Sequence, residues 1–346
     1  MGSFGALEYR SSTGMTMKAA VPALACLCCS FVLTAPASAA CVLKKITEMP
    51  LVELGAHYAV AVKINDVTRL MIVDTGSEVT LFKSSFADEL NLAPDYSSSD
   101  LKPVLGVGQT QAEIHMNVIP SFLGFGDLVY RDRTTVVAEM DFGKQAENDS
   151  VGLLGDDILS QFDVEFDFPS RKLTFYREFD CYNTFSPWTG AYSTVPFDHH
   201  GAKIVLDVIL NQERTKAIVD TGNNASFISR NSSALWDVSD DELSETKSRS
   251  TSPLNGGTSF SIRTYGFEKV KIGDEVFSKM TMRVADVEFP FGSANLGLDY
   301  WRTRKIWISY PNNWMFIANP PSITAVAYPV RALKPAPPEA AIADNQ

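Results

Sequence analysis

The sequence predicts a mostly β protein built from two related halves with short helices. Short apolar or alternating stretches recur between frequent turns, and few stretches show a helical period, which is typical of β architecture. Residues 71–77, MIVDTGS, return in near-copy as residues 217–223, AIVDTGN. The two aspartates of these copies are 146 positions apart. That spacing is the size of a domain and far exceeds a solenoid repeat.

Length and charge limit the classes of partner. A chain of 346 residues can bury a sizeable core, and its length alone favours two domains. It carries 30 basic against 41 acidic residues, a net charge of −11. Nucleic acids and anionic membrane surfaces require clustered Lys and Arg. We therefore expect neither as a partner.

Residues 1–40 have the pattern of a signal peptide. Lys18 precedes the apolar segment 21–33, and the small residues 37–40, ASAA, follow it as in a cleavage site. The apolar segment is too short to span a bilayer comfortably, and no later segment is long and apolar enough to cross one. We expect an exported protein without a membrane span, periplasmic or secreted.

The cysteines leave alternatives open. Three of the five lie in the apolar segment, so only Cys41 and Cys181 remain in the mature chain. An oxidising compartment permits a disulfide between them, and two free thiols are equally compatible with the sequence. Lipid attachment at Cys41 is less favoured, because residues 38–41, SAAC, lack the usual Leu.

Each half begins with a predicted hairpin. Residues 57–65 and 202–211 alternate like half-buried strands, and the first turns near Asn65-Asp66. Each strand then leads into its apolar Asp-Thr-Gly stretch, where the glycine indicates a sharp bend that a Cβ would obstruct.

The elements that follow also come in pairs. Glycine-containing hairpins are predicted around Gly106, Val107 and Gly108 and around Gly256 and Gly257. Further paired predictions are strands at 134–138 and 280–284, apolar-Gly turns at 153–155 and 296–297, short helices at 156–162 and 298–302, and closing strands at 172–176 and 313–317.

These elements give the domain boundaries. We predict a first lobe over residues 41–177, a linker over 178–194, a second lobe over 195–319 and a Pro/Ala-rich disordered tail over 320–346. His199-His200 lacks further ligands at metal-binding spacing, which indicates a surface pair rather than a zinc site.

The repeated aspartates point to acid–base chemistry. An isolated buried carboxylate is costly, so two copies suggest that Asp74 and Asp220 meet between the halves. Two carboxylates about 3 Å apart cannot both stay ionised, so the pair shares one proton. One carboxylate then accepts a proton from a bound water while the protonated group polarises a peptide carbonyl. The sequence does not say which aspartate holds the proton.

The neighbouring residues have predicted supporting roles. Gly76 and Gly222 let backbone N–H groups approach the carboxylates, and the hydroxyls of Thr75 and Thr221 are placed to cross the interface. Ser77 is expected to donate to Asp74 from its outer side, and Asn223 follows the second turn at the matching position. The glycine hairpins are expected to close over an extended substrate bound as an added strand.

At these residues the sequence resembles the pepsin and retropepsin aspartic peptidases. The match comprises residues 74–77 and 153–155 in the first half and residues 220–222 and 296–297 in the second. It spans roughly residues 52–319 and looks closest to bacterial retropepsin-like proteins with two fused lobes. Asn223 stands where Ser, Thr or Ala usually follows the glycine, and Asn295 replaces an apolar residue before Leu296-Gly297.

The resemblance implies a bilobal acid-protease fold with pseudo-twofold symmetry, catalytic Asp74 and Asp220, and no metal or cofactor. It also implies a peptide or unfolded-protein substrate and a monomer that supplies both halves of the site. The expected function is therefore an aspartic endopeptidase. The alternatives are a weak or inactive peptide-binding protein with the same cleft, and a site that pairs lobes from two chains.

Overall fold

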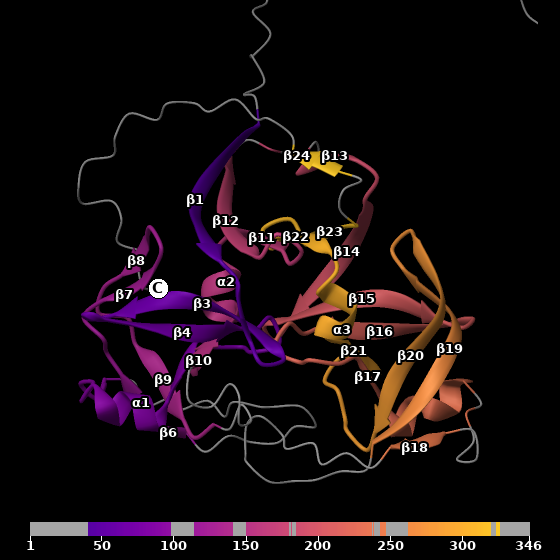
Figure 1. Cartoon of the computed structure of the whole chain (residues 1–346), viewed down its shortest axis with the longest axis horizontal. Helices are drawn as coiled ribbons and strands as arrows, with labels where there is room; N and C mark the ends of the chain where they lie inside the picture. Colours follow the sequence, from indigo (N-terminus) through magenta and orange to yellow (C-terminus); the bar gives the residue numbers. More distant parts are fainter. Residues whose placement is uncertain are drawn as a thin grey trace, which may run out of the picture. The chain divides into compact units, whose positions relative to one another are not determined.

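The computed structural model describes residues 41–97, 114–140, 150–179, 181, 185–236, 238, 243–246, 262–319 and 323–325. All of them belong to one compact unit, Ala40–Gln346. Strands dominate these residues, with a few short helical segments between them (Figure 1). The prediction of a mostly β fold with short helices is confirmed. The predicted signal peptide lies outside the described residues.

The first half of the chain is a run of short strands. Its elements are β1 (Val42–Pro50), β2 (Val52–Leu54), β3 (His57–Ile64), β4 (Val67–Val73), β5 (Leu81–Lys83), α1 (Ser84–Glu89), β6 (Ile114–Val118), β7 (Leu123–Phe125), β8 (Leu128–Tyr130), β9 (Thr135–Ala138), β10 (Ser150–Leu154), α2 (Asp156–Leu159), β11 (Asp163–Asp167) and β12 (Lys172–Phe179).

The second half has a similar order and contains one long hairpin at residues 262–285, β19–β20. Its elements are β13 (Trp188–Gly190), β14 (Ser193–His200), β15 (Lys203–Leu210), β16 (Glu213–Val219), β17 (Phe227–Ser229), the 3-10 helix η2 (Arg230–Trp236), β18 (Ser244–Thr246), β19 (Ile262–Ile272), β20 (Glu275–Ala285), β21 (Ala294–Leu296), α3 (Leu298–Trp301), β22 (Lys305–Ser309), β23 (Trp314–Ala318) and β24 (Ile323–Ala325).

The two halves share one pairing pattern. In the first, the strand order β9-β5-β10-β4-β3 places β4 parallel to β10 and antiparallel to β3. In the second, β20-β17-β21-β16-β15 places β16 parallel to β21 and antiparallel to β15. The strand that leads into each aspartate is thus a central strand with neighbours on both sides.

The hairpins before the aspartates turn through equivalent residues. Asn65 between β3 and β4 has a φ of 51°, and Asn211 between β15 and β16 has a φ of 57°. Asparagine tolerates this left-handed region better than most residues. Each side-chain oxygen also accepts a backbone N–H, from Phe122 at 3.2 Å and from Glu268 at 2.9 Å.

A third set of strands joins the halves. The order β1-β12-β11-β22-β23-β14 is antiparallel throughout, and β11 pairs with β22 over five residues, from Asp163↔Ser309 to Asp167↔Lys305. The two halves are therefore bound by main-chain hydrogen bonds as well as by side chains.

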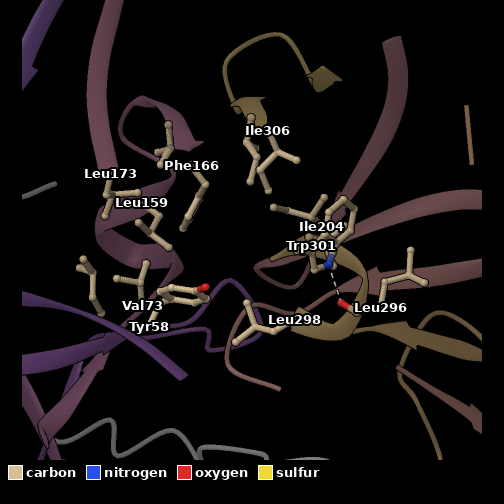
Figure 2. Packing of buried hydrophobic residues seen from close by; sticks show 14 of the residues in the cluster. Tyr58, Val73, Leu159, Phe166, Leu173, Ile204, Leu296, Leu298, Trp301 and Ile306 are labelled. Atoms are coloured by element: carbon tan, nitrogen blue, oxygen red, sulfur yellow. Dashed lines mark hydrogen bonds between the residues drawn. The ribbon is translucent and has the colours of Figure 1, made fainter. Parts of the chain in front are cut away.

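One apolar cluster extends through both halves. Tyr58 and Val73 of the first half and Leu296 and Trp301 of the second belong to the same cluster of buried residues (Figure 2). The indole N–H of Trp301 donates to the Leu296 carbonyl at 2.7 Å. Packing on this cluster fixes the strands that lead into both aspartate turns, since close-packed interiors tolerate little displacement.

The ends of the second half differ from the expected boundaries. The predicted linker contains β13, which pairs with β24 through Trp188↔Ala325. The expectation of disorder from residue 320 is therefore wrong for Ile323–Ala325, because those three residues extend a strand pair; the rest of that segment lies outside the described residues.

A disulfide joins Cys41 to Cys181, the two cysteines whose pairing the sequence left open. It lies at the end of the β1–β12 ladder, next to the pair Val42↔Phe179. Among the described residues, none of the helices has the length and apolar character needed to cross a membrane.

Candidate active site

Two equivalent strands deliver Asp74 and Asp220. β4 ends at Val73 and β16 at Val219. The N–H of Asp74 donates to the Leu154 carbonyl and that of Asp220 to the Leu296 carbonyl, both at 3.0 Å. The apolar-Gly stretches thus hold the turns that the sequence analysis paired with them.

The two turns are hydrogen-bonded to each other through their threonines. The Thr75 hydroxyl donates to the Val219 carbonyl at 2.9 Å and accepts the Thr221 N–H at 3.0 Å. The Thr221 hydroxyl donates to the Val73 carbonyl at 2.8 Å and accepts the Thr75 N–H at 3.1 Å. Both threonines are buried. These four bonds fix the separation of the two acidic turns.

The two carboxyl groups lie against the opposite glycines. A Cβ at Gly76 would lie 2.6 Å from Asp220 Cγ, and a Cβ at Gly222 would lie closer still to Asp74 Cγ. The carboxyl groups of Asp74 and Asp220 also interact through a hydrogen bond. Only glycine leaves room for this approach.

The donors around the two carboxyl groups differ. Asp74 Oδ1 accepts the N–H of Gly76 at 2.7 Å. Asp220 Oδ1 accepts the N–H of Asn223 at 3.0 Å, and its Oδ2 accepts the side-chain Nδ2 of Asn295 at 2.7 Å. The pair is therefore symmetric in its backbone and asymmetric in its hydrogen bonding.

The acidity of the pair departs from that of free carboxyls. Burial, followed by the negative charge of Asp220, raises the pKa of Asp74 to about 7. The ammonium of Lys203 and the N–H of Gly76 lower the pKa but do not reverse the shift. Two acids this close titrate as a coupled unit.

Two basic residues cross between the halves at equivalent positions. His57 and Lys203 begin β3 and β15. The Lys203 ammonium donates to the Gly76 carbonyl and lies 3.7 Å from a Glu78 carboxylate oxygen. The imidazole of His57 donates to the Gly222 carbonyl, and burial lowers the pKa of His57. Each base thus supports the aspartate turn of the opposite half.

This pair of bases is absent from the residues predicted from the sequence. Both residues begin alternating strands, where a polar side chain at the end is ordinary. Their spacing could have revealed them, because His57 and Lys203 are as far apart in sequence as Asp74 and Asp220 and therefore hold equivalent positions in the repeat.

A second matched set braces the outer side of each turn. Thr80 donates its N–H and hydroxyl to Asp157 Oδ1 at 2.6 and 2.7 Å. Ser226 donates its N–H and hydroxyl to the carboxylate of Asp299 at 2.9 and 2.6 Å. Each hydroxyl also accepts the N–H of the glycine before the short helix, Gly155 at 3.1 Å and Gly297 at 3.0 Å. These contacts tie the aspartate turns to α2 and α3.

One predicted contact is wrong. The Ser77 hydroxyl donates to the Val79 carbonyl at 2.8 Å, so its single proton is not available to Asp74. His199 and His200 are both exposed, as predicted for a surface pair; His199 Nε2 in addition lies 3.0 Å from Asp156 Oδ1, and its ring packs on Tyr310. The predicted substrate-covering residues Gly106, Val107, Gly108, Gly256 and Gly257 lie outside the described residues.

Within the described ranges, no cluster of three or more His, Cys, Asp or Glu side chains is arranged to hold a metal ion. The chemistry available at this site is that of two coupled carboxyl groups in a braced, partly buried setting. Such a pair can hold and transfer one proton to and from a bound water.

Comparison with known families points the same way. No curated protein matches the chain. Residues 60–158 match the model of a family described as aspartyl protease. The matched stretch begins in β3, contains the turn of Asp74 and ends in α2. This part of the chain is thus similar to aspartyl proteases, which supports a hydrolase of the aspartic protease type.

Proposed function

We propose that the protein is an aspartic endopeptidase in which Asp74 and Asp220 together activate one water. The observation that carries the proposal is the set of four threonine hydrogen bonds, which hold two acidic turns face to face. This bracing uses hydrogen-bonding groups from both halves, and it positions the two carboxyl groups. Fixed geometry of this kind is what acid–base catalysis requires.

The reaction follows from one shared proton. The ionised carboxylate takes a proton from the water, whose oxygen attacks the scissile carbonyl carbon, while the protonated carboxyl donates toward the carbonyl oxygen. The tetrahedral intermediate collapses when a proton reaches the leaving nitrogen and the C–N bond breaks. No covalent bond to the protein forms.

The substrate we propose is an extended peptide or an unfolded protein. The family match supports a peptide substrate, and both acidic turns come from one chain, which supports an active monomer. Sedimentation of the active species tests that point: activity confined to a dimer would favour pairing of lobes from two chains.

Isosteric substitutions test the chemistry. Asp74→Asn and Asp220→Asn should each lower the cleavage rate of an unfolded protein by about 10²-fold or more, because each removes the acid–base function of one group. Asp207→Asn, at the exposed position of β15, is the matched control and should cleave at the wild-type rate.

Cleavage that survives both substitutions would contradict the proposal. If the wild type cleaves nothing from acidic to neutral pH and yet binds an extended peptide, the inactive peptide-binding alternative is correct. A peptide inhibitor with a hydroxyl in place of the scissile carbonyl adds a binding test, since it mimics the tetrahedral state.

We also propose that the protein acts outside the cytoplasm. The apolar N-terminal pattern and the Cys41–Cys181 disulfide support export to an oxidising compartment. Cell fractionation tests this: recovery of the mature chain in the cytoplasm would contradict it.

A further inference from the structure

Asn295 breaks the symmetry of the acidic pair. It precedes Leu296-Gly297 in the second half, as Leu153 precedes Leu154-Gly155 in the first. Leu153 is an apolar core residue beside Leu81 and Ile72. Asn295 is also buried, but its amide donates to Asp220. The two halves therefore differ at the one position where a side chain from the supporting strand reaches a carboxyl group.

The orientation of the Asn295 amide is fixed by chemistry. Its Nδ2 lies 2.7 Å from Asp220 Oδ2, while its Oδ1 is buried with no partner among the described residues. The reverse orientation would place two oxygens in contact and bury an unpaired N–H. In the reverse orientation a protonated Asp220 could donate to the amide oxygen, but both amide N–H groups would then be buried without partners, so the amide donates. Burying an amide with an unpaired carbonyl is unfavourable, which is expected where function rather than stability selects the residue.

We infer that Asn295 is a positioning residue that keeps Asp220 ionised, so that Asp220 is the base and Asp74 holds the shared proton. Asp220 accepts one N–H on each oxygen, whereas Asp74 accepts one backbone N–H. Hydrogen bonds donated to a carboxylate favour its charged form. Only the roles of base and acid rest on the proposed function. The location of the shared proton is a property of the folded protein.

The surrounding charges do not overturn this assignment. The Lys203 ammonium favours an ionised Asp74, but it donates to the Gly76 carbonyl and is shared with Glu78. On the side of Asp220, burial lowers the pKa of His57, which disfavours a charged imidazolium there. With Lys203 present, the pKa of Asp74 is still raised to about 7.

The test removes the donor and follows both carboxyls. Asn295→Leu installs the residue found at the equivalent place, and Asn295→Ala removes the donor without adding a larger or charged group. Leu153→Met is the control, an apolar change on the other half. The ¹³C signals of the two carboxyl carbons, assigned with Asp74→Asn and Asp220→Asn, are followed against pH.

In the wild type the Asp220 carboxyl should ionise at lower pH than Asp74. Asn295→Leu should raise the titration midpoint of Asp220 by about one pH unit or more, the scale of one hydrogen bond to a charged group. The acidic limb of kcat/KM against pH should move by the same amount, and Leu153→Met should move neither.

Ionisation of Asp74 before Asp220, or an unchanged Asp220 midpoint in Asn295→Leu, overturns the inference. If Asn295→Leu does not fold, the order of ionisation in the wild type and the midpoint in Asn295→Ala decide. Absence of cleavage by the wild type would refute the proposed function alone, because the carboxyl titrations require no turnover.

Discussion

At the scale of single residues, Thr75 and Thr221 illustrate how far identical sequence can specify a contact. Each lies in a near-copy of the same stretch, and each hydroxyl makes the same two bonds to the opposite turn. Because both groups at the far end are main-chain atoms, the contact needs no particular partner side chain. That is why the crossing hydroxyls could be predicted from the repeat.

Thr75→Val should separate this bracing from simple packing. Valine keeps the branched shape but leaves the Val219 carbonyl and the Thr221 N–H buried without partners, so we expect a loss of roughly 2–4 kcal/mol in the free energy of unfolding. Thr75→Ser keeps the hydroxyl and is the matched control. Urea denaturation measures both; equal losses in the two variants would show that the methyl group, not the hydroxyl, matters.

Asn295 and Ser77 show where sequence reasoning fails at this scale. Asn295 was noted as a departure from an apolar pattern, yet the donor role of its amide depends on a distance that no pattern supplies. Ser77 had the expected chemistry for Asp74 but turns to the Val79 carbonyl. Local backbone geometry determines which of two nearby acceptors a hydroxyl donates to, and the sequence does not reveal that geometry.

At the scale of elements, the hairpins and short helices were predictable and the joining sheet was not. The predicted strand at residues 57–65 became β3, and the predicted helices at 156–162 and 298–302 became the shorter α2 and α3. Alternation and turn residues are local signals. The pairing of β11 with β22 connects residues more than 130 positions apart, and nothing local encodes it.

That joining sheet contains a second pair of acids. Asp163 on β11 accepts the Trp307 indole N–H at 3.3 Å, and Glu178 on β12 accepts the Ser309 hydroxyl at 3.2 Å. Burial, followed by the charge of Glu178, raises the pKa of Asp163 to about 7, and burial also raises the pKa of Glu178. Asp163 Oδ2 and Glu178 Oε2 are buried and find no partner in the described part of the chain.

This pair should make stability depend on pH. Between the ordinary pKa of Asp163, 3.8, and its raised value of about 7, the folded state binds more protons than the unfolded state. The free energy of unfolding therefore falls as pH rises through this range, by an amount on the order of a few kcal/mol.

Asp163→Asn should flatten that dependence, because the amide keeps an acceptor for Trp307 and does not ionise. Denaturation of both proteins at several pH values between about 4 and 8 measures the difference, with the exposed Asp207→Asn as control. Parallel curves for wild type and Asp163→Asn would show that other groups set the pH dependence.

At the scale of the whole molecule, the ends of the first half are held together twice. β1 pairs with β12 along eight residue pairs, and the Cys41–Cys181 disulfide closes the same ladder across a separation of 140 residues. A cross-link over so long a loop restricts the unfolded chain strongly.

Replacing both cysteines, Cys41→Ser with Cys181→Ser, should lower the free energy of unfolding by about 2–4 kcal/mol. Wild type treated with a reductant should behave like the double variant, and reductant should leave the double variant unchanged. Equal stability of the oxidised wild type and the double variant would show that the β1–β12 ladder alone secures the end of the first half.

The joining sheet has a consequence for synthesis. Asp74 is made early, whereas Asp220, Asn295 and the β22 strand that pairs with β11 leave the ribosome much later. A growing chain therefore contains Asp74 without Asp220, and its β11 strand still lacks its partner β22. Asp74 and Asp220 can therefore pair only when translation is nearly complete, so any hydrolytic activity appears late in synthesis.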